Sequence, residues 1–253
     1  MLRSAPLAVP FAVPFALAAV LALAGCGSKE AADGEVPEAA AVAAVPAPAG
    51  QVWSEIAAVS PEGGIVAGNP NAPIKLVEYA SHTCGHCAEF AEASAEPLRT
   101  KYIDSGKVSF EIRNQIHDPI DLTVAVLARC AGPQAFHALA EQSWANLENI
   151  FATVRTNEAA LTAASQAQGA ARFDGIANAA GLYDFFAARG ISRDQARACL
   201  AKTDTATQIA NNSEAQSAEL NVTGTPTFFI NGRNVGTQSW ATLEPMLQRA
   251  GAR

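Results

Sequence analysis

The chain has 253 residues, enough for one domain of about 200 residues behind a leader, or for two small domains. Its formal net charge is −7 and it has no run of Lys or Arg, which excludes the usual basic footprint of a nucleic-acid-binding protein. The four His are too few and too scattered for a His-rich metal-binding tract.

The N-terminus has the layout of an export signal. Arg3 is followed by an uncharged, largely apolar run over residues 5–24, typical of a secretory signal peptide. The run ends in L-A-G-C at residues 23–26, which resembles the lipobox of bacterial lipoproteins. The resemblance implies that residues 1–25 are removed as a signal peptide and that Cys26 carries lipid. Ordinary signal cleavage after Ala24 and an uncleaved helical anchor are the alternatives, and all three predict export.

The segment after the leader is of low complexity. Residues 26–50 consist mainly of Ala, Pro, Glu and Gly, which predicts a disordered tether ahead of a domain over residues 51–253. Residues 52–66 are ambiguous, with a Pro-Glu-Gly-Gly turn at 61–64 and a short strand expected near Ile65.

A strand–helix–strand unit comes next. Residues 74–79 are apolar enough for a buried strand, and a C-x-x-C pair at 84–87 follows it. Residues 88–102 are rich in helix formers, although Pro97 should kink or interrupt that helix. Residues 107–112 alternate polar and apolar side chains, which predicts a second strand and a right-handed crossover unit.

The rest of the chain divides into a helical block and a C-terminal β-hairpin with a helix. The pattern is helical from about residue 118 to 220. Residues 227–230 form a strong strand signal, and Asn231-Gly232 predicts a hairpin turn before a strand near Val235. A last helix should run from about Ser239 to Arg249.

The spacing of the paired cysteines points to redox chemistry. At the start of a helix, free backbone N–H groups and the helix dipole favour a thiolate, so Cys84 should have a lowered pKa. Cys87 lies one turn inside, where a buried resolving thiol is expected. A protonated His86 between them would stabilise the Cys84 thiolate further and make the disulfide more oxidising. The alternative for His86 is that it only covers the end of the helix.

The order of elements, together with Gly-Thr-Pro-Thr at residues 224–227, resembles the DsbA-like branch of the thioredoxin superfamily over about residues 68–249. The resemblance implies an α/β thioredoxin fold with an inserted all-helical subdomain. It also implies that Pro226 is cis and that Thr225 offers backbone groups to an extended substrate segment. Glu78 matches an acidic residue that takes or relays the proton of the buried thiol. A solvent-exposed Glu78 at the strand end is the alternative.

Two cysteines lie in the helical block, Cys130 and Cys199. Some relatives in this family carry a structural disulfide, which implies one here, and an exported protein favours bonded cysteines. Free buried thiols are the alternative.

These observations predict an enzyme that donates the Cys84–Cys87 disulfide to reduced or misoxidised exported proteins through a mixed disulfide at Cys84. A membrane redox partner would restore the disulfide, with no bound cofactor and no metal required. We expect a monomer on the periplasmic side of the cell envelope, held by lipid at Cys26. The alternatives are an isomerase or reductase of the same fold, and a metal carrier using the two thiols with His86 or His82.

Overall fold

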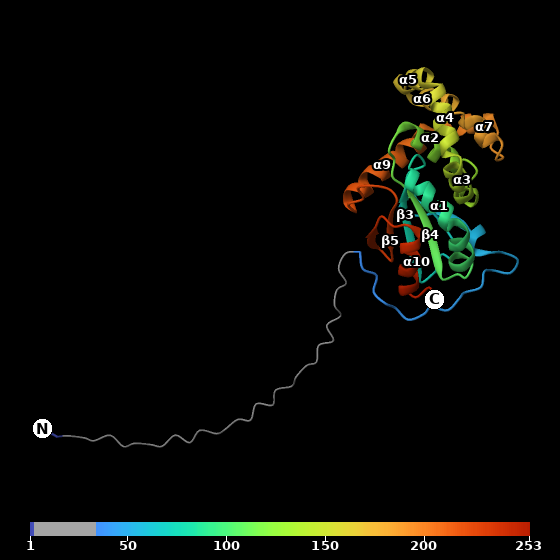
Figure 1. Ribbon diagram of the computed structural model, residues 1–253. Helices are drawn as coiled ribbons and strands as arrows, with labels where there is room; N and C mark the ends of the chain where they lie inside the picture. Colours follow the sequence, from blue (N-terminus) through green and yellow to red (C-terminus); the bar gives the residue numbers. More distant parts are fainter. Residues whose placement is uncertain (3–33) are drawn as a thin grey trace. The chain divides into compact units, whose positions relative to one another are not determined.

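The computed structural model describes residues 1–2 and 34–253 (Figure 1). Cys26 and nearly all of the predicted signal peptide fall in residues 3–33, outside the described part. Within the described residues, no helix is both long and apolar enough to cross a bilayer.

A six-stranded mixed sheet forms the centre of the domain, in the order β1-β2-β4-β3-β5-β6. The central strands β3 and β4 are parallel and the other pairs are antiparallel. The strands are β1 (Ala57–Val59), β2 (Ile65–Ala67), β3 (Ile74–Ala80), β4 (Val108–Asn114), β5 (Thr227–Ile230) and β6 (Arg233–Gly236). A parallel pair requires a crossover connection, and α1 (Gly85–Pro97) supplies it between β3 and β4.

Eight helices separate β4 from β5, as the fold-class prediction of an inserted helical subdomain requires. They are α2 (Pro119–Arg129), α3 (Pro133–Ala145), α4 (Leu147–Thr156), α5 (Glu158–Gln166), α6 (Gly169–Ala179), α7 (Leu182–Ala187), α8 (Arg193–Leu200) and α9 (Thr203–Glu219). Figure 1 shows α4 to α7 at the end of the domain away from the sheet, whereas α3 returns alongside α1. The prediction of a thioredoxin fold with a helical insertion is confirmed.

The last helix, α10 (Trp240–Arg249), packs beside α1. The Phe90 ring of α1 lies 4.5 Å from the ring of Phe228 on β5 and 6.4 Å from that of Trp240, measured between centroids. These aromatic contacts attach α1 to the sheet and to α10, which holds the start of α1 in place.

Pro97 ends the regular part of α1. The chain continues as a wider, π-type helical segment over Leu98–Ile103 before turning into β4. Proline lacks a backbone N–H and clashes with the preceding turn, so a change of helical geometry at this residue has an identifiable cause.

Residues 34–50 are ordered against the domain, so the prediction of a disordered tether is wrong for this part of residues 26–50. The backbone N–H groups of Ala39 and Val42 donate to the carbonyls of Arg249, the last residue of α10, and of Gly251 just beyond it. Val36 is buried in the core, and the Trp53 indole donates to the Val45 carbonyl at 2.7 Å. We call residues 34–50 the strap; Figure 1 shows it running past the C-terminal end of α10.

Candidate active site

Cys84 lies at the point where the central strand passes into α1. The chain leaves β3 at Ala80, crosses a three-residue loop, and reaches Cys84 in extended geometry as the N-cap of α1. Cys84 is half-buried and Cys87 is fully buried, and both are free thiols. The structure therefore presents one accessible sulfur at a helix N-terminus and one shielded sulfur a turn inside the helix.

The environment lowers the pKa of Cys84 from its usual 9 to about 5. A hydrogen bond from the Cys87 thiol is the largest cause, followed by the side chain of Thr225 and the backbone N–H groups of Cys87 and His86; partial burial opposes them. Each of these donors stabilises the thiolate. At neutral pH Cys84 is therefore ionised and ready to act as a nucleophile or leaving group.

The buried partner behaves in the opposite way. Burial is the main cause that raises the pKa of Cys87, and its hydrogen bond to Cys84 and the nearby negative charges of Glu78 and Cys84 add to it. The pair is thus split into a thiolate and a thiol. This asymmetry is the arrangement expected of an attacking sulfur and a resolving sulfur.

The His86 side chain contributes less to stabilising the Cys84 thiolate than its position between the cysteines suggested. Its side chain is exposed, and Nδ1 lies 3.0 Å from a carboxylate oxygen of Glu89. The interaction with Glu89 is the main cause that raises the pKa of His86, with a smaller attraction from the Cys84 thiolate. For Cys84 itself, the main contribution of His86 is its backbone N–H rather than its imidazole.

Glu78 is buried in β3, so the exposed alternative is wrong. Its neighbours across the sheet are Ile112 on β4 and Phe228 on β5. Burial and then the Cys84 charge raise the pKa of Glu78 to about 8, so it is protonated at neutral pH. No described protein atom hydrogen-bonds to its Oε1. A buried, protonated carboxyl close to a buried thiol can exchange a proton with it.

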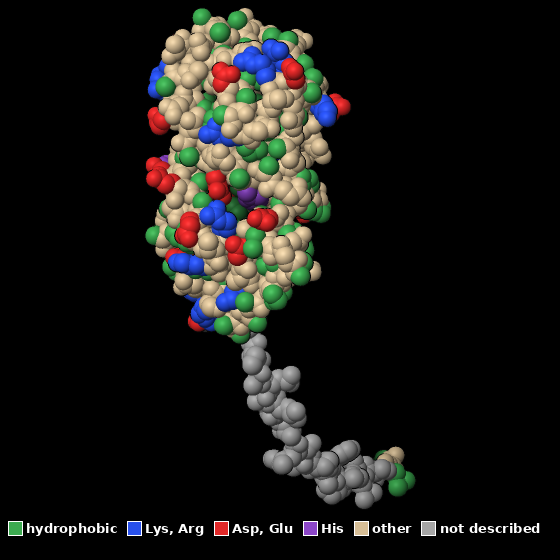
Figure 2. Space-filling model, turned by 90° about the vertical axis from the view of Figure 1, so that its right-hand side faces the viewer, with side chains coloured by type: hydrophobic (Ala, Val, Ile, Leu, Met, Phe, Trp, Pro, Cys, Tyr) green, Lys and Arg blue, Asp and Glu red, His purple; other side chains and the backbone are tan. Residues whose placement is uncertain are grey.

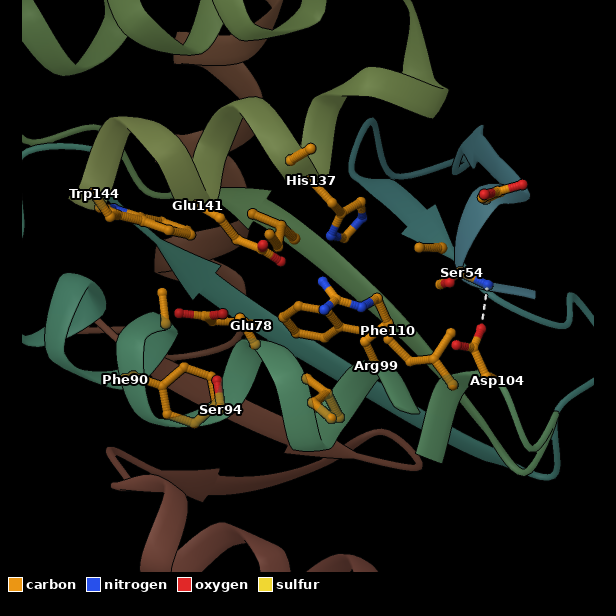
Figure 3. A pocket seen from close by; sticks show the side chains of 18 of the residues that line it. Ser54, Glu78, Phe90, Ser94, Arg99, Asp104, Phe110, His137, Glu141 and Trp144 are labelled. Carbon is orange, nitrogen blue, oxygen red and sulfur yellow. Dashed lines mark hydrogen bonds between the residues drawn. The ribbon is translucent and has the colours of Figure 1, made fainter. Parts of the chain in front are cut away.

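Glu78 reaches a cavity of about 530 Å³ between α1, α3 and the sheet. Figure 3 shows Glu78, Glu141 of α3 and Arg99 pointing into the same space. The small side chains Ala91 of α1 and Ala138 of α3 also line it. Burial raises the pKa of Glu141, and the positive charge of Arg99 opposes that rise. On this side of the molecule, Figure 2 shows a hollow bordered by acidic and basic side chains. The cavity gives Glu78 a polar neighbourhood apart from the thiols.

The second loop of the site carries Thr225 and Pro226, joined by a cis peptide bond. The carbonyl oxygen of Thr225 lies 3.3 Å from Cys84 Sγ and accepts a hydrogen bond from it when Cys84 is protonated. Both residues are buried, and Thr227 Oγ1 donates to the Gly224 carbonyl, which fixes the turn. The structure thus brings Cys84, Cys87, Thr225 and Pro226 together at one place.

Two acidic residues at the start of α2 also belong to this region, and the sequence analysis did not identify them. Asp118 caps α2 and accepts a hydrogen bond from the Thr83 hydroxyl at 2.6 Å. Asp121 is fully buried and accepts backbone hydrogen bonds from His82 and His117. The Asp-Pro start of α2 is a recognisable helix-capping signal, but nothing in the sequence shows that it meets the Cys84 loop.

His82 is not placed to complete a metal site with the two thiols. It is buried, its ring stacks on Trp144 at 5.4 Å, and its Nδ1 lies 3.2 Å from the Ser143 hydroxyl. Burial lowers the pKa of His82 to about 3, so it remains neutral. The described part of the chain contains no group of three or more His, Cys, Asp or Glu arranged to hold a metal ion.

A disulfide links the end of α2 to α8 within the helical insertion. Cys130, after α2, is bonded to Cys199 on α8 with a Cα–Cα distance of 6.0 Å. Both residues are partly exposed, so the alternative of free buried thiols is wrong. The bond lies within the insertion and is separate in sequence from the Cys84–Cys87 pair.

Comparison with known proteins agrees with this geometry. Residues 60–249 match a family model described as thioredoxin. A protein-disulfide isomerase structure from Novosphingobium aromaticivorans is 34% identical, with a TM-score of 0.68 over 73% of this chain and 96% of that one. The Wolbachia pipientis alpha-DsbA1 structure is 21% identical, with a TM-score of 0.59 over 74% and 89% of the two chains. The chain therefore belongs to the thioredoxin family, as a DsbA-like member with the helical insertion.

A curated relative from Rickettsia conorii is also similar. It carries the provisional name protein-disulfide oxidoreductase and is 30% identical over 190 residues, 75% of this chain. The match spans 61% of the Rickettsia protein. The predicted family is confirmed.

Proposed function

We propose that this protein is an exported thiol–disulfide oxidoreductase that donates the Cys84–Cys87 disulfide to other exported proteins. The observation that carries the proposal is the split between the two thiols: the environment lowers the pKa of Cys84 to about 5 and raises that of Cys87. A stabilised thiolate favours the dithiol form of the pair, which makes its disulfide a better oxidant. The names of the relatives agree with disulfide exchange.

The reaction proceeds by two thiol–disulfide exchanges. A substrate thiolate attacks Cys84 Sγ, the Cys84–Cys87 bond breaks, and Cys87 leaves with the electron pair. Glu78, protonated at neutral pH, supplies the proton that the buried Cys87 sulfur needs. A second substrate thiolate then attacks the substrate sulfur of the mixed disulfide and releases Cys84 as a stable thiolate. The substrate loses two electrons and the pair gains them.

The substrate segment would lie along the loop of Thr225 and Pro226, where backbone groups face Cys84. An extended chain can pair with the backbone of a protein by adding a strand beside it. This arrangement suits unfolded or partly folded clients, because it reads the backbone rather than particular side chains. A membrane redox partner would then return the pair to the disulfide.

Export and lipid attachment at Cys26 form part of the proposal. The apolar run at residues 5–24 and the L-A-G-C motif support them, as does the partly exposed Cys130–Cys199 disulfide, a bond type that persists in oxidising compartments. Radiolabelled palmitate incorporation, compared between the natural chain and a Cys26→Ser variant, tests the lipid. No label in the natural chain would overturn this part alone.

The direction of electron flow is tested by the reduction potential of the pair, equilibrated with glutathione in the Cys26→Ser protein. We expect a value between about −120 and −180 mV, the range of known oxidants and isomerases. A value near about −270 mV would make the protein a reductant and refute disulfide donation.

An isomerase is the second candidate, because the 34% identical Novosphingobium aromaticivorans structure bears that name. Recovery of activity by a scrambled disulfide protein, with no added oxidant, separates the two. An isomerase restores native pairing under these conditions, whereas a donor of disulfides only oxidises reduced substrate.

A further inference from the structure

One buried acidic side chain binds both the Cys84 loop and the His117 segment, which in turn contacts the loop of Thr225 and Pro226. Asp121 lies in the first turn of α2 with no solvent exposure. Its Oδ1 accepts the backbone N–H of His82 at 2.7 Å, and its Oδ2 accepts the backbone N–H of His117 at 2.9 Å. The two oxygens of one side chain therefore bind two segments that are far apart in the sequence.

Each of these segments leads to the Cys84 sulfur. His82 is two residues before Cys84 in the loop after β3. On the other side, the imidazole Nε2 of His117 lies 3.4 Å from Thr225 Oγ1, and the Thr225 carbonyl oxygen lies 3.3 Å from Cys84 Sγ. Four contacts thus connect Cys84, Thr225, His117, Asp121 and His82 in turn, and the chain from His82 to Cys84 closes the circuit.

The neighbouring carboxylate strengthens one side of this circuit. Asp118 Oδ2 accepts the hydroxyl of Thr83, the residue just before Cys84, while Oδ1 caps α2. The first turn of the insertion thus supplies two acidic side chains to the three-residue loop ahead of Cys84. A third contact from the insertion is the Trp144 indole of α3, which donates to the Ser81 carbonyl in the same loop.

Burying the Asp121 carboxyl group disfavours its charged form. Burial, and to a lesser extent the nearby Asp118, raise the pKa of Asp121 to about 7, against hydrogen bonds from Ser81, His117 and His82 that lower it. No Lys or Arg in the described part of the chain forms an ion pair with Asp121. A buried acidic group without a cationic partner is more typical of a functional site than of a stabilising core position.

We propose that Asp121 is a positioning residue of the redox site, which sets the Cys84 loop against the loop of Thr225 and Pro226 and so controls the reactivity of the Cys84 sulfur. The inference rests on the proposed function of Cys84 as the reacting sulfur. The helical insertion then influences the redox site, because Asp121 of α2 holds the Cys84 loop directly and the Thr225 loop through His117.

The Asp121→Asn variant of the Cys26→Ser protein tests the proposal. An amide keeps one accepting oxygen but turns an N–H₂ group toward the second backbone N–H, so one of the two loop contacts is lost. Losing the equivalent of one hydrogen bond to the thiolate should move the midpoint of the pH profile for Cys84 alkylation by iodoacetamide upward by about 0.5 to 1 pH unit. The profile is measured on the reduced protein, in which the buried Cys87 does not react at low pH.

Asp104→Asn is the matched control. Asp104 Oδ1 also accepts a backbone N–H, that of Ser54 at 2.9 Å, but Asp104 lies in the turn before β4 and forms no hydrogen bond or ion pair with a described residue of the Cys84 or Thr225 loops. Its alkylation profile should coincide with that of the parent protein. If Asp121→Asn lowers the melting temperature but leaves the profile unchanged, Asp121 is only structural and the proposal fails.

A second variant, His117→Ala, keeps the test decisive if Asp121→Asn does not fold. The His117 side chain is exposed, so its removal does not open the core. It removes the contact with Thr225 and should shift the alkylation midpoint in the same direction. An unchanged profile would show that His117 does not couple Asp121 to the Thr225 loop, and would contradict the proposal. Alkylation needs no partner protein, so a parent protein that oxidises no substrate would refute the proposed function without affecting this comparison.

Discussion

Reduction of the Cys84–Cys87 disulfide should stabilise the protein in a pH-dependent way. The folded dithiol form holds Cys84 as a thiolate, with its pKa lowered from 9 to about 5. A lowered pKa stabilises the folded state fully above the unfolded value near 9, and this stabilisation is lost as the pH falls through about 5. The advantage of the reduced form over the oxidised form should therefore shrink from pH 9 to pH 5.

The magnitude follows from the size of the pKa shift. Lowering the pKa from 9 to about 5, at about 1.4 kcal/mol per pH unit, stabilises the folded state by at most about 5 kcal/mol above pH 9. The stabilisation is about half of that at pH 7, where the unfolded thiol is still protonated. Cys84 is only half-buried, and solvent screening halves the effect again, to about 1–1.5 kcal/mol at pH 7. For a domain of this size the melting temperature should change by about 2–5 °C.

The assay is thermal unfolding of the reduced and oxidised Cys26→Ser protein between pH 5 and 9, with the thiolate absorbance at 240 nm followed in parallel. The reduced Cys84→Ser variant is the control, since it lacks the titrating sulfur and should show little of this pH dependence. A thiolate midpoint near 9, or a constant difference in melting temperature across this pH range, would contradict the reasoning.

Three further predictions follow from contacts in the described domain. Glu78→Gln should slow the step in which Cys87 leaves by at least about 10-fold at pH 7, because the buried proton donor is lost. Stopped-flow fluorescence with a reduced peptide measures the rate of this step, and an unchanged rate would exclude proton transfer from Glu78. Replacing Cys130 and Cys199 together by Ala should lower the free energy of unfolding by about 2–5 kcal/mol in urea titrations, because the bond closes a loop between residues 69 positions apart. Trp53→Phe removes the indole bond to Val45 and should cost about 1 kcal/mol while leaving the alkylation profile of Cys84 unchanged; equal stability would show that the strap contributes little.

The redox site was predictable because its signals are local. A buried strand, a C-x-x-C pair and a helix in succession determine where Cys84 lies, since the N-terminus of that helix must follow the end of the strand. The Thr225-Pro226 step came from the family resemblance, and the structure places it against Cys84. The charge state of the two thiols follows from the same local arrangement.

Other features depend on contacts that leave no pattern in the sequence. The strap has the composition of a flexible linker, yet backbone hydrogen bonds hold it to the C-terminal end of α10 and the residues after it. Such bonds do not depend on which side chains the strap carries. The strand β1 is short and has few large apolar residues, and it forms because β2 offers a free edge beside it. The imidazole of His86 interacts with Glu89, three residues further along the helix. The position of His86 between the two cysteines therefore overestimated how far its side chain lowers the pKa of Cys84.

The position of Asp121 shows why the inserted helices cannot be regarded as a separate cover over a thioredoxin core. The loop that carries Cys84 is held from the side of the insertion, by Asp118, Asp121 and the Trp144 indole, as well as by the end of β3. In such an arrangement the reactivity of the sulfur depends on residues outside the C-x-x-C motif. Two proteins with the same dipeptide between their cysteines can therefore differ in oxidising power, because the first turn of α2 sets the geometry in which that dipeptide acts.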